Sequence, residues 1–354
     1  MLRFLRSAIL TSAVAVVPLW LGCGSLWTPF LEDRPNCQTN PAACALQDGG
    51  AVDGLPPDGL PSDGGTEPPL VCSKDRWCLE NPTTPTSPKQ DLWQVWGSDV
   101  SNVWAVGGTG TPSTGVILKR SGTSWTIAYS GATPLTGIWG TSASNIWVVG
   151  YAGTILKWNG SVWSPQASGT TKILYAVWGV DASNVWAVGE AGTILKWNGS
   201  TWTAQSSGVT EDLFGLWAVD ASNVWAVGRN GTIRKWNGVS WAAQTSNTTE
   251  FLSHIWGTAA SNAWAIGGNG TIRRWNGNMW AAQTSGTTQL LAGVWGSDAI
   301  NVWAVGFTGT ILKWNGASWS PQDAGTTQNL QRAWGSAGHV FVTGYGGTIL
   351  HLAP

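Results

Sequence analysis

The sequence predicts an all-β fold in which one four-stranded unit occurs seven times and closes into a ring, over residues 71–354. The first observation is a tryptophan that recurs after 43 residues and then every 39 residues, at Trp96, Trp139, Trp178, Trp217, Trp256, Trp295 and Trp334. A period of this length is typical of repeat architectures. The second observation is that each repeat holds short runs of β-branched and aromatic residues. The third is that the last repeat lacks its fourth run.

The strands can be placed within a single repeat. In the third copy the predicted strands are residues 174–179, 184–189, 192–197 and 201–206, and clusters of Gly, Asn, Asp and Ser separate them. None of these runs has a helical period. The fourth strand is marked by a tryptophan in only six copies, at Trp125, Trp163, Trp202, Trp241, Trp280 and Trp319.

The missing fourth strand indicates how the ring closes. A matching segment, Arg76 to Asn81 around Trp77, precedes the first repeat and can complete the last one. Closure removes the unpaired edge that an open stack of sheets would expose. Four short strands in a unit of about 40 residues resemble the blades of WD-repeat, YVTN and Asp-box (BNR) proteins. The resemblance implies a seven-bladed β-propeller, and the absent fourth strand argues against a solenoid.

Residues 1–23 have the pattern of a secretory signal peptide. Arg3 and Arg6 precede an apolar stretch, residues 8–21, that is too short to span a bilayer comfortably. The stretch ends at Leu21-Gly22-Cys23, which resembles the lipobox of bacterial lipoproteins, although Trp20 stands where that pattern normally has Leu. The resemblance implies a lipid on Cys23 and an outer-membrane anchor, on the periplasmic or the cell-surface side. Ordinary signal cleavage is the alternative.

Residues 24–70 have the composition of a disordered tether, with 8 Pro and 7 Gly. All five cysteines lie in the first 78 residues, and four remain once Cys23 is assigned to lipid. Export permits disulfides, and of the three connectivities we predict the local one, Cys37 with Cys44 and Cys72 with Cys78. The spacing of these cysteines, without a nearby His, is a weak signal for zinc, so no metal is predicted.

Composition bears on the partner class. The net charge is −1, so the basic field that nucleic-acid binding normally needs is missing. The 28 Trp recur in one register, which favours packing between blades over a sugar-stacking surface. A cation precedes most W-N-G motifs, at Lys119, Lys157, Lys196, Lys235, Arg274 and Lys313, with His351 in the last copy. Packing over Trp is favoured for this row, and a cationic ring for anionic glycolipid is the alternative.

The repeats disagree mainly at two places, the turn between the second and third strands and the start of the first strand. Because strands alternate in direction, both places lie on one face of the ring. Residues that vary on rigid turns have the composition of a recognition surface. Neutral drift at turn tips is the alternative. The candidate ligand-binding residues are Trp93, Tyr151, Tyr175, Glu190, Phe214, Arg229, His254, Phe307, Arg332 and Tyr345.

These observations favour a binding protein over an enzyme. Sialidase-like chemistry needs three converging Arg, and the variable face offers Arg229 and Arg332. Loop carboxylates such as Glu190 and Glu250 leave a glycoside hydrolase or lyase as a less favoured hypothesis. We expect a monomer without a cofactor that recognises a surface glycan or an envelope protein. A passive scaffold for envelope assembly is the competing hypothesis.

Overall fold

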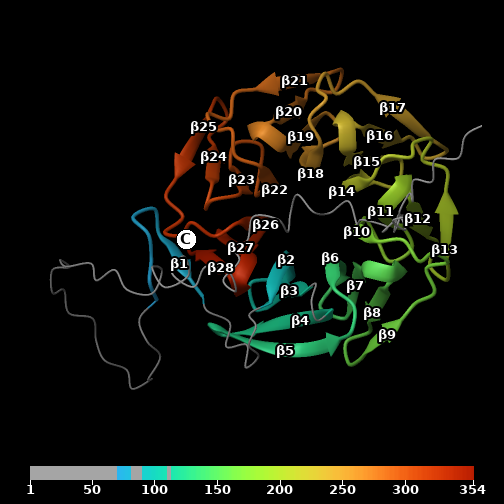
Figure 1. Ribbon diagram of the computed structural model, residues 1–354, viewed down its shortest axis with the longest axis horizontal. Helices are drawn as coiled ribbons and strands as arrows, with labels where there is room; N and C mark the ends of the chain where they lie inside the picture. The colour runs from blue at the N-terminus through green and yellow to red at the C-terminus, as the bar shows by residue number, and fades with distance from the viewer. Residues whose placement is uncertain (1–69, 81–89, 110–112) are drawn as a thin grey trace, which may run out of the picture. The chain divides into compact units, whose positions relative to one another are not determined.

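The computed structural model describes residues 70–80, 90–109 and 113–354, which form a closed ring of seven four-stranded antiparallel sheets (Figure 1). The predicted seven-bladed β-propeller is confirmed. The predicted signal peptide, the lipidation site Cys23, most of the tether and the pair Cys37–Cys44 lie outside the described residues.

Six blades follow the chain, each from its innermost to its outermost strand. Blade 1 is β2 (Asp91–Asp99), β3 (Asn102–Thr109), β4 (Thr114–Ser121) and β5 (Ser124–Gly131); blade 2 is β6 (Leu135–Ser142), β7 (Asn145–Gly150), β8 (Ile155–Trp158) and β9 (Trp163–Pro165); blade 3 is β10 (Leu174–Gly179), β11 (Val185–Gly189), β12 (Ile194–Trp197) and β13 (Trp202–Gln205). Blade 4 is β14 (Leu213–Asp220), β15 (Asn223–Gly228), β16 (Ile233–Trp236) and β17 (Trp241–Gln244); blade 5 is β18 (Leu252–Ala259), β19 (Asn262–Gly267), β20 (Ile272–Trp275) and β21 (Trp280–Gln283); blade 6 is β22 (Leu291–Gly296), β23 (Val302–Gly306), β24 (Ile311–Trp314) and β25 (Trp319–Gln322).

Blade 7 combines strands from both ends of the propeller. It contains β26 (Leu330–Ser336), β27 (His339–Gly344) and β28 (Ile349–Leu352), and its outer strand is β1 (Trp77–Leu79). β1 runs antiparallel to β28, with Trp77 opposite Leu352. The predicted closure by an N-terminal strand is therefore confirmed. The predicted disulfide Cys72–Cys78 is also present and ties Cys78, in the middle of this strand, to the segment before it.

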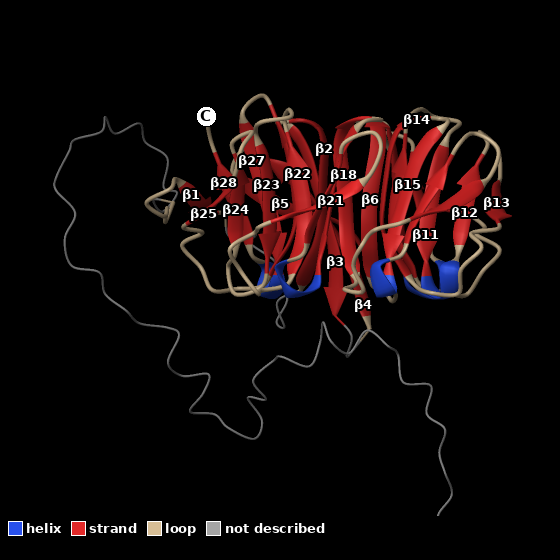
Figure 2. Cartoon of the chain, turned by 90° about the horizontal axis from the view of Figure 1, so that it is seen from above, coloured by secondary structure: helices blue, strands red, loops and turns tan. Residues whose placement is uncertain are grey.

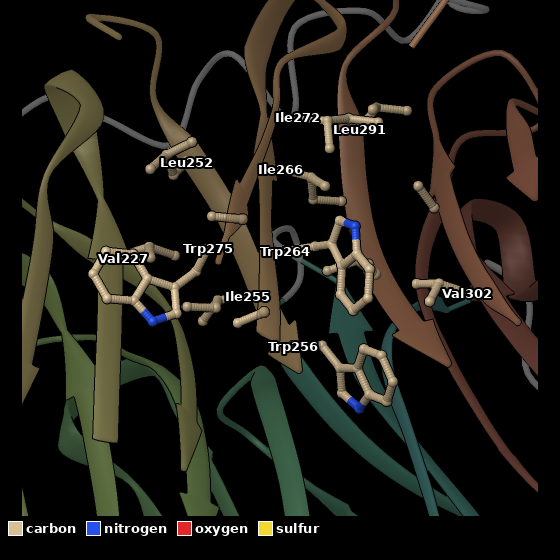
Figure 3. Close-up of a cluster of buried hydrophobic side chains, with 14 of the residues drawn as sticks. Val227, Leu252, Ile255, Trp256, Trp264, Ile266, Ile272, Trp275, Leu291 and Val302 are labelled. Atoms are coloured by element: carbon tan, nitrogen blue, oxygen red, sulfur yellow. The ribbon is translucent and has the colours of Figure 1, made fainter. Parts of the chain in front are cut away.

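The core lies between the blades and is rich in tryptophan. Figure 3 shows one such cluster, in which Trp264 is fully buried and Trp256 and Trp275 are 8% and 7% exposed. Rings of this size bury large apolar areas and dominate core energetics. The Trp residues thus pack between blades.

A tryptophan interlock joins the innermost strands of successive blades. Six of the seven strand-one Trp rings pack on a glycine of the next blade, so close that a Cβ there would lie 2.6–2.8 Å from the ring. The pairs are Trp96 on Gly140, Trp139 on Gly179, Trp217 on Gly257, Trp256 on Gly296, Trp295 on Gly335 and Trp334 on Gly97. At the seventh seam, Ala218 takes the place of glycine and its carbonyl accepts a hydrogen bond from Trp178 Nε1 at 3.1 Å.

Short 3-10 turns between second and third strands gather on one side of the ring, which we call the turn face (Figure 2). They are η3 (Tyr151–Gly153), η4 (Glu190–Gly192), η5 (Arg229–Gly231), η6 (Gly268–Gly270) and η7 (Tyr345–Gly347). The middle residue of a turn is left-handed, as in Ala152 with φ 52°, and the glycine after it, Gly153, touches the Thr170 carbonyl so closely that no Cβ fits. The loops between blades therefore pack directly beneath the turns.

Among the described residues, no helix is long and apolar enough to cross a membrane.

Candidate binding face

The ten predicted site residues all lie on or just beneath the turn face. Backbone hydrogen bonds hold the turn tips to the loop that precedes the same blade: Tyr151 N donates to Pro134 O, Glu190 N to Ile173 O and Arg229 N to Asp212 O, at 2.9–3.0 Å. Each first tip residue therefore has a fixed backbone, which makes the face rigid. The side chains then meet their neighbours in four groups.

The first group joins blades 1 and 2. Trp93, at the start of β2, stacks on Tyr151 of η3 with ring centroids 6.1 Å apart and an interplanar angle of 20°. Trp93 is buried and Tyr151 is partly exposed. Burial raises the pKa of Tyr151 above its usual value of 10.0, so this phenol is neutral and a hydrogen-bond donor at physiological pH.

The second group spans blades 3 to 5. Tyr175 and Phe214 have ring centroids 5.3 Å apart, and Phe214 meets Phe251 edge-on at 6.3 Å. The Arg229 guanidinium lies 5.5 Å above the Phe214 ring, and its Nε donates to the Asp212 carboxylate at 2.9 Å. Sequence reasoning left out Phe251, which lies just before the first strand of blade 5, two positions ahead of the variable pair Ser253 and His254.

The third group covers blades 6 and 7, where Phe307 and Tyr345 lie with ring centroids 6.1 Å apart. Glu190 is placed separately, on η4. Its carboxylate accepts a hydrogen bond from Ile173 N at 3.2 Å, which fixes the loop that leads into blade 3. Each side chain thus has a partner from an adjacent loop or blade.

The fourth group lies deeper, between the innermost strands. Arg332 of blade 7 reaches across two blades and donates to the carbonyls of Ala292 and Ser253. His254 Nδ1 accepts from Val294 N at 3.2 Å. Burial, with the nearby charge of Arg332, holds the pKa of His254 well below 6.5, and burial lowers the pKa of Arg332 to about 10. The imidazole is therefore neutral and the guanidinium charged at neutral pH.

Burial of the predicted residues differs from what the sequence suggested. Six are buried, namely Trp93, Tyr175, Phe214, His254, Phe307 and Tyr345, while Tyr151, Glu190, Arg229 and Arg332 are partly exposed. The reason is that neighbouring blades approach closely at the ring interior, so side chains from adjacent tips cover one another. What the face presents to solvent is mainly the second turn residues, including Ala152, Ala191, Asn230 and Asn269. Ligand binding by the ten residues stays a prediction.

The row of cations before the W-N-G motifs packs over tryptophan. Lys157 Nζ lies 4.5 Å from the Trp147 ring centroid of its own blade and 5.1 Å from that of Trp197 in the next blade. Lys196, Lys235 and Arg274 bridge successive blades in the same way. These cation–π contacts bind adjacent blades together.

A charged cluster at the seam between blades 7 and 1 was missed by sequence reasoning. Glu80, which follows β1, accepts hydrogen bonds from Arg120 at 2.7 Å and from Trp125 Nε1 at 2.9 Å, and pairs with His351 at 2.9 Å. His351 in turn bonds His339 at 2.8 Å. Burial alone would raise the pKa of Glu80, but the bonds from His351, Arg120 and Trp125 outweigh it and lower the pKa to about 2.

Two of the loop carboxylates on the turn face take part in contacts within the protein. Among the described residues, no group of three or more His, Cys, Asp or Glu side chains could hold a metal ion. Asp212 is paired with Arg229 and Glu190 with a backbone amide, so these carboxylates are occupied in structural contacts. Asp212 and Glu190 therefore help to hold neighbouring loops in place.

Comparison with known proteins identifies the fold. No protein-family model and no curated protein matches the chain. A solved structure of YCF48 bound to D1 peptide is similar, with 16% identity and a TM-score of 0.65, over 81% of this chain and 98% of that one. YCF48 from Cyanidioschyzon merolae gives 18% identity and a TM-score of 0.61, over 78% of this chain and 99% of that one. The WD40 propeller domain of Doa1 gives 13% identity and a TM-score of 0.65, over 77% of this chain and 96% of that one. The predicted likeness to WD-repeat propellers is confirmed, and the chain has the fold of the YCF48 and WD40 propellers.

Proposed function

We propose that the protein is a non-enzymatic binding module that recognises a partner protein of the cell envelope through its turn face. The observation that carries the proposal is that the repeats keep one scaffold and vary on one face. The variable residues include aromatic, acidic and basic side chains, which is the composition of interfaces. YCF48 has been solved bound to D1 peptide, so a propeller of this architecture can bind a protein segment.

Rigidity supports the proposal physically. The turn tips are held by backbone hydrogen bonds and by glycines that admit no side chain, so little conformational entropy remains to be lost when a partner binds. Tyr151 and Arg229 keep part of their surface exposed at the rim of this face. They are the residues that we assign to direct contact, with the buried aromatics holding them in place.

We further propose that the module works outside the cytoplasm, anchored by a lipid on Cys23 and held away from the membrane by the segment 24–70. The signal-like N-terminus and the lipobox resemblance support this location. The disulfide Cys72–Cys78 agrees with it, because disulfides persist in oxidising compartments.

Site-specific photocrosslinking in the producing cells tests the turn face. A photoreactive residue is placed in the full-length chain at the exposed tips Ala152, Asn230 or Asn269, and for comparison at Val239 and Met279 in the hairpins of the opposite face. We expect one discrete protein adduct from the turn-face positions and none from the hairpins. Adducts from both faces alike, or from the hairpins only, would overturn the assignment.

A glycan is the competing ligand, and a glycan-array screen of the purified full-length chain separates the two. Selective glycan binding without a protein adduct would establish a lectin in place of a protein-binding module. Silence on the array with a discrete adduct supports the proposal.

A further inference from the structure

Two equivalent seams of the ring each contain an arginine at the same repeat position, and the two arginines have different contacts. Arg234 in β16 and Arg273 in β20 occupy one repeat position, which is leucine in the other blades, at Leu118, Leu156, Leu195, Leu312 and Leu350. Each arginine faces the loop that ends the preceding blade. Because the copies are otherwise alike, each seam serves as a control for the other.

At the seam between blades 3 and 4, a terminal nitrogen of the arginine has an acceptor within the protein, although Arg234 Nε is buried without one. Arg234 Nη2 donates to the carbonyl of Trp241 at 3.2 Å. A Cβ on Gly208, in the preceding loop, would lie 2.6 Å from that same Nη2. The guanidinium therefore lies directly against Gly208 and depends on the absence of a side chain there.

At the seam between blades 4 and 5, asparagine replaces that glycine. Asn247 has φ 58° and donates from Nδ2 to the carbonyl of Trp280 at 3.2 Å. Trp280 is the counterpart of Trp241, so the amide occupies both the place and the acceptor that the arginine uses one seam earlier. Arg273 consequently makes no hydrogen bond or ion pair with the residues that the structure describes. Its Nε is buried without a partner, as Arg234 Nε is, but Arg273 also lacks the terminal contact that Arg234 makes through Nη2.

Arg273 instead lines two adjoining hollows at the outer rim of the turn face. One, of about 710 Å³, is formed by blade 5 itself, between Asn269 in η6 and the segment 282–288. The other, of about 750 Å³, is formed by residues 244–250 of blade 4. Arg273 is the one charged side chain among the described residues that line the first hollow, whereas Glu250 also lines the second. A buried guanidinium nitrogen without an acceptor is costly unless a ligand supplies one.

We propose that Arg273 binds a carboxylate of an extended peptide segment from a protein partner, in the hollow of blade 5. Guanidinium and carboxylate match in a bidentate geometry, and Glu250 repels an anion from the second hollow. The lining of both hollows holds hydroxyl, amide and backbone groups and no aromatic ring, which favours peptide over sugar. β21, the outermost strand of this blade, presents an open edge to which an extended main chain can bond. The inference rests on the proposed function in that the partner is a protein, but it concerns a separate, peripheral site.

The test is an array of random decapeptides probed with the labelled full-length chain. Half of the peptides carry one Asp or Glu and half carry Asn or Gln at the same position, and all have amidated C-termini. We expect the strongest binders to be acidic, and Arg273→Gln to weaken them by roughly tenfold or more. Because Arg273 has no partner within the protein, this variant should keep the wild-type unfolding midpoint.

Two substitutions use the repeat as a matched control. Asn247→Gly recreates, between blades 4 and 5, the arrangement found between blades 3 and 4. Arg273 should then donate to the Trp280 carbonyl, and peptide binding should fall although the arginine is present. Gly208→Asn in the Arg273→Gln background should expose Arg234 and restore binding. Arg234→Gln alone should have no effect on binding.

Any of four outcomes would overturn the proposal. Neutral peptides could bind as well as acidic ones, or no peptide could bind. Arg234→Gln and Arg273→Gln could weaken peptide binding equally, or Asn247→Gly could bind peptides as well as the wild type. Polyglucuronate that binds through Arg273 while the peptides do not would assign the site to an acidic glycan. Crosslinking from Ala152 and Asn230, which line neither hollow, is independent of all these results, so the two proposals can fail separately.

Discussion

At the scale of single residues, the repeats change in pairs where the environment changes. Glu80 stands where the outer strands of blades 2 to 6 have glutamine, at Gln166, Gln205, Gln244, Gln283 and Gln322. Arg120, in β4, stands where the third strands of blades 2 to 6 have the tryptophan of W-N-G. Its guanidinium lies 4.9 Å from the centroid of the Phe341 ring, in place of the Trp–Trp contact of other seams. These two charged residues are therefore specific to the seam between blades 7 and 1, where the N-terminal strand docks.

Glu80→Gln should destabilise the protein, because it leaves Arg120, whose side chain is only 12% exposed, without its counter-ion. The expected loss is about 3 kcal/mol in free energy of unfolding. The double variant Glu80→Gln with Arg120→Trp restores the pair found at other seams and should recover at least half of that loss. Denaturant unfolding of the two single variants and the double variant measures the coupling. Additive losses would show that the pair does not act as a unit.

Acidification should weaken the fold in two stages. His254 and His339 have pKa values lowered chiefly by burial, so the stability that they contribute above pH 6.5 is lost as the pH falls below it. Glu80 has a folded pKa of about 2 against 4.5, so its contribution, about 3 kcal/mol, is present above pH 4.5 and lost between pH 4.5 and 2. Unfolding measured from pH 8 to about 2 should show both stages. A Glu80→Gln protein that keeps the lower stage would contradict this assignment.

At the scale of elements, β1 is short, with three residues, yet it covers the whole edge of β28. Trp77 is 1% exposed and belongs to the core cluster of blade 7. The disulfide Cys72–Cys78 closes a small loop that includes the start of this strand. A strand this short is held by its flanking contacts, the buried Trp77 on one side and the Glu80 cluster on the other.

Removal of residues 1–89 should leave a ring with an open edge. The exposed β28 can pair with another chain, so we expect a lower unfolding midpoint together with concentration-dependent association. Light scattering after size-exclusion chromatography measures the association. Adding a synthetic peptide of residues 70–89 should reverse it, and a peptide with Trp77→Ala is the control. A monomeric truncation with an unchanged midpoint would contradict the role of β1.

At the scale of the whole molecule, the Trp-on-Gly interlock repeats around the ring and couples each blade to the next. Gly257→Ala should destabilise by about 1–3 kcal/mol, since the added Cβ would lie 2.6 Å from the Asn262 carbonyl and 2.8 Å from Trp217. Ala218→Gly is the reverse change, at the seam that already accepts a methyl group. It should lower the free energy of unfolding by less than about 1 kcal/mol, as for an ordinary Ala→Gly substitution in a strand. Thermal unfolding compares the two. Equal effects would show that the interlock carries no special constraint.

The sequence predicts the scaffold well because the scaffold is periodic. The strands expected in the third repeat begin and end within two residues of β10 to β13, and the closing strand and Cys72–Cys78 are found where they were expected. The burial of Phe307 and Tyr345 could not be predicted, because it depends on contacts between tips of different blades. The Glu80–Arg120 pair did have a signal, since K-R-S-G interrupts the K-W-N-G pattern at Arg120. Asn247 in place of glycine was a similar signal for Arg273.

Closure of the ring by β1 also constrains the order in which the blades fold while the chain is being synthesised. Arg76 Nη1 bonds the Pro354 carbonyl across 278 residues, so β1 leaves the ribosome early and its partner strand emerges last among those described. Bringing together two segments that far apart in the chain costs about 5 kcal/mol in chain entropy. This cost is removed if the other blades stack first, because the stacked blades already hold the two ends close together. Docking of β1 is then a late step, and substitutions that weaken it should speed unfolding and leave the folding rate almost unchanged.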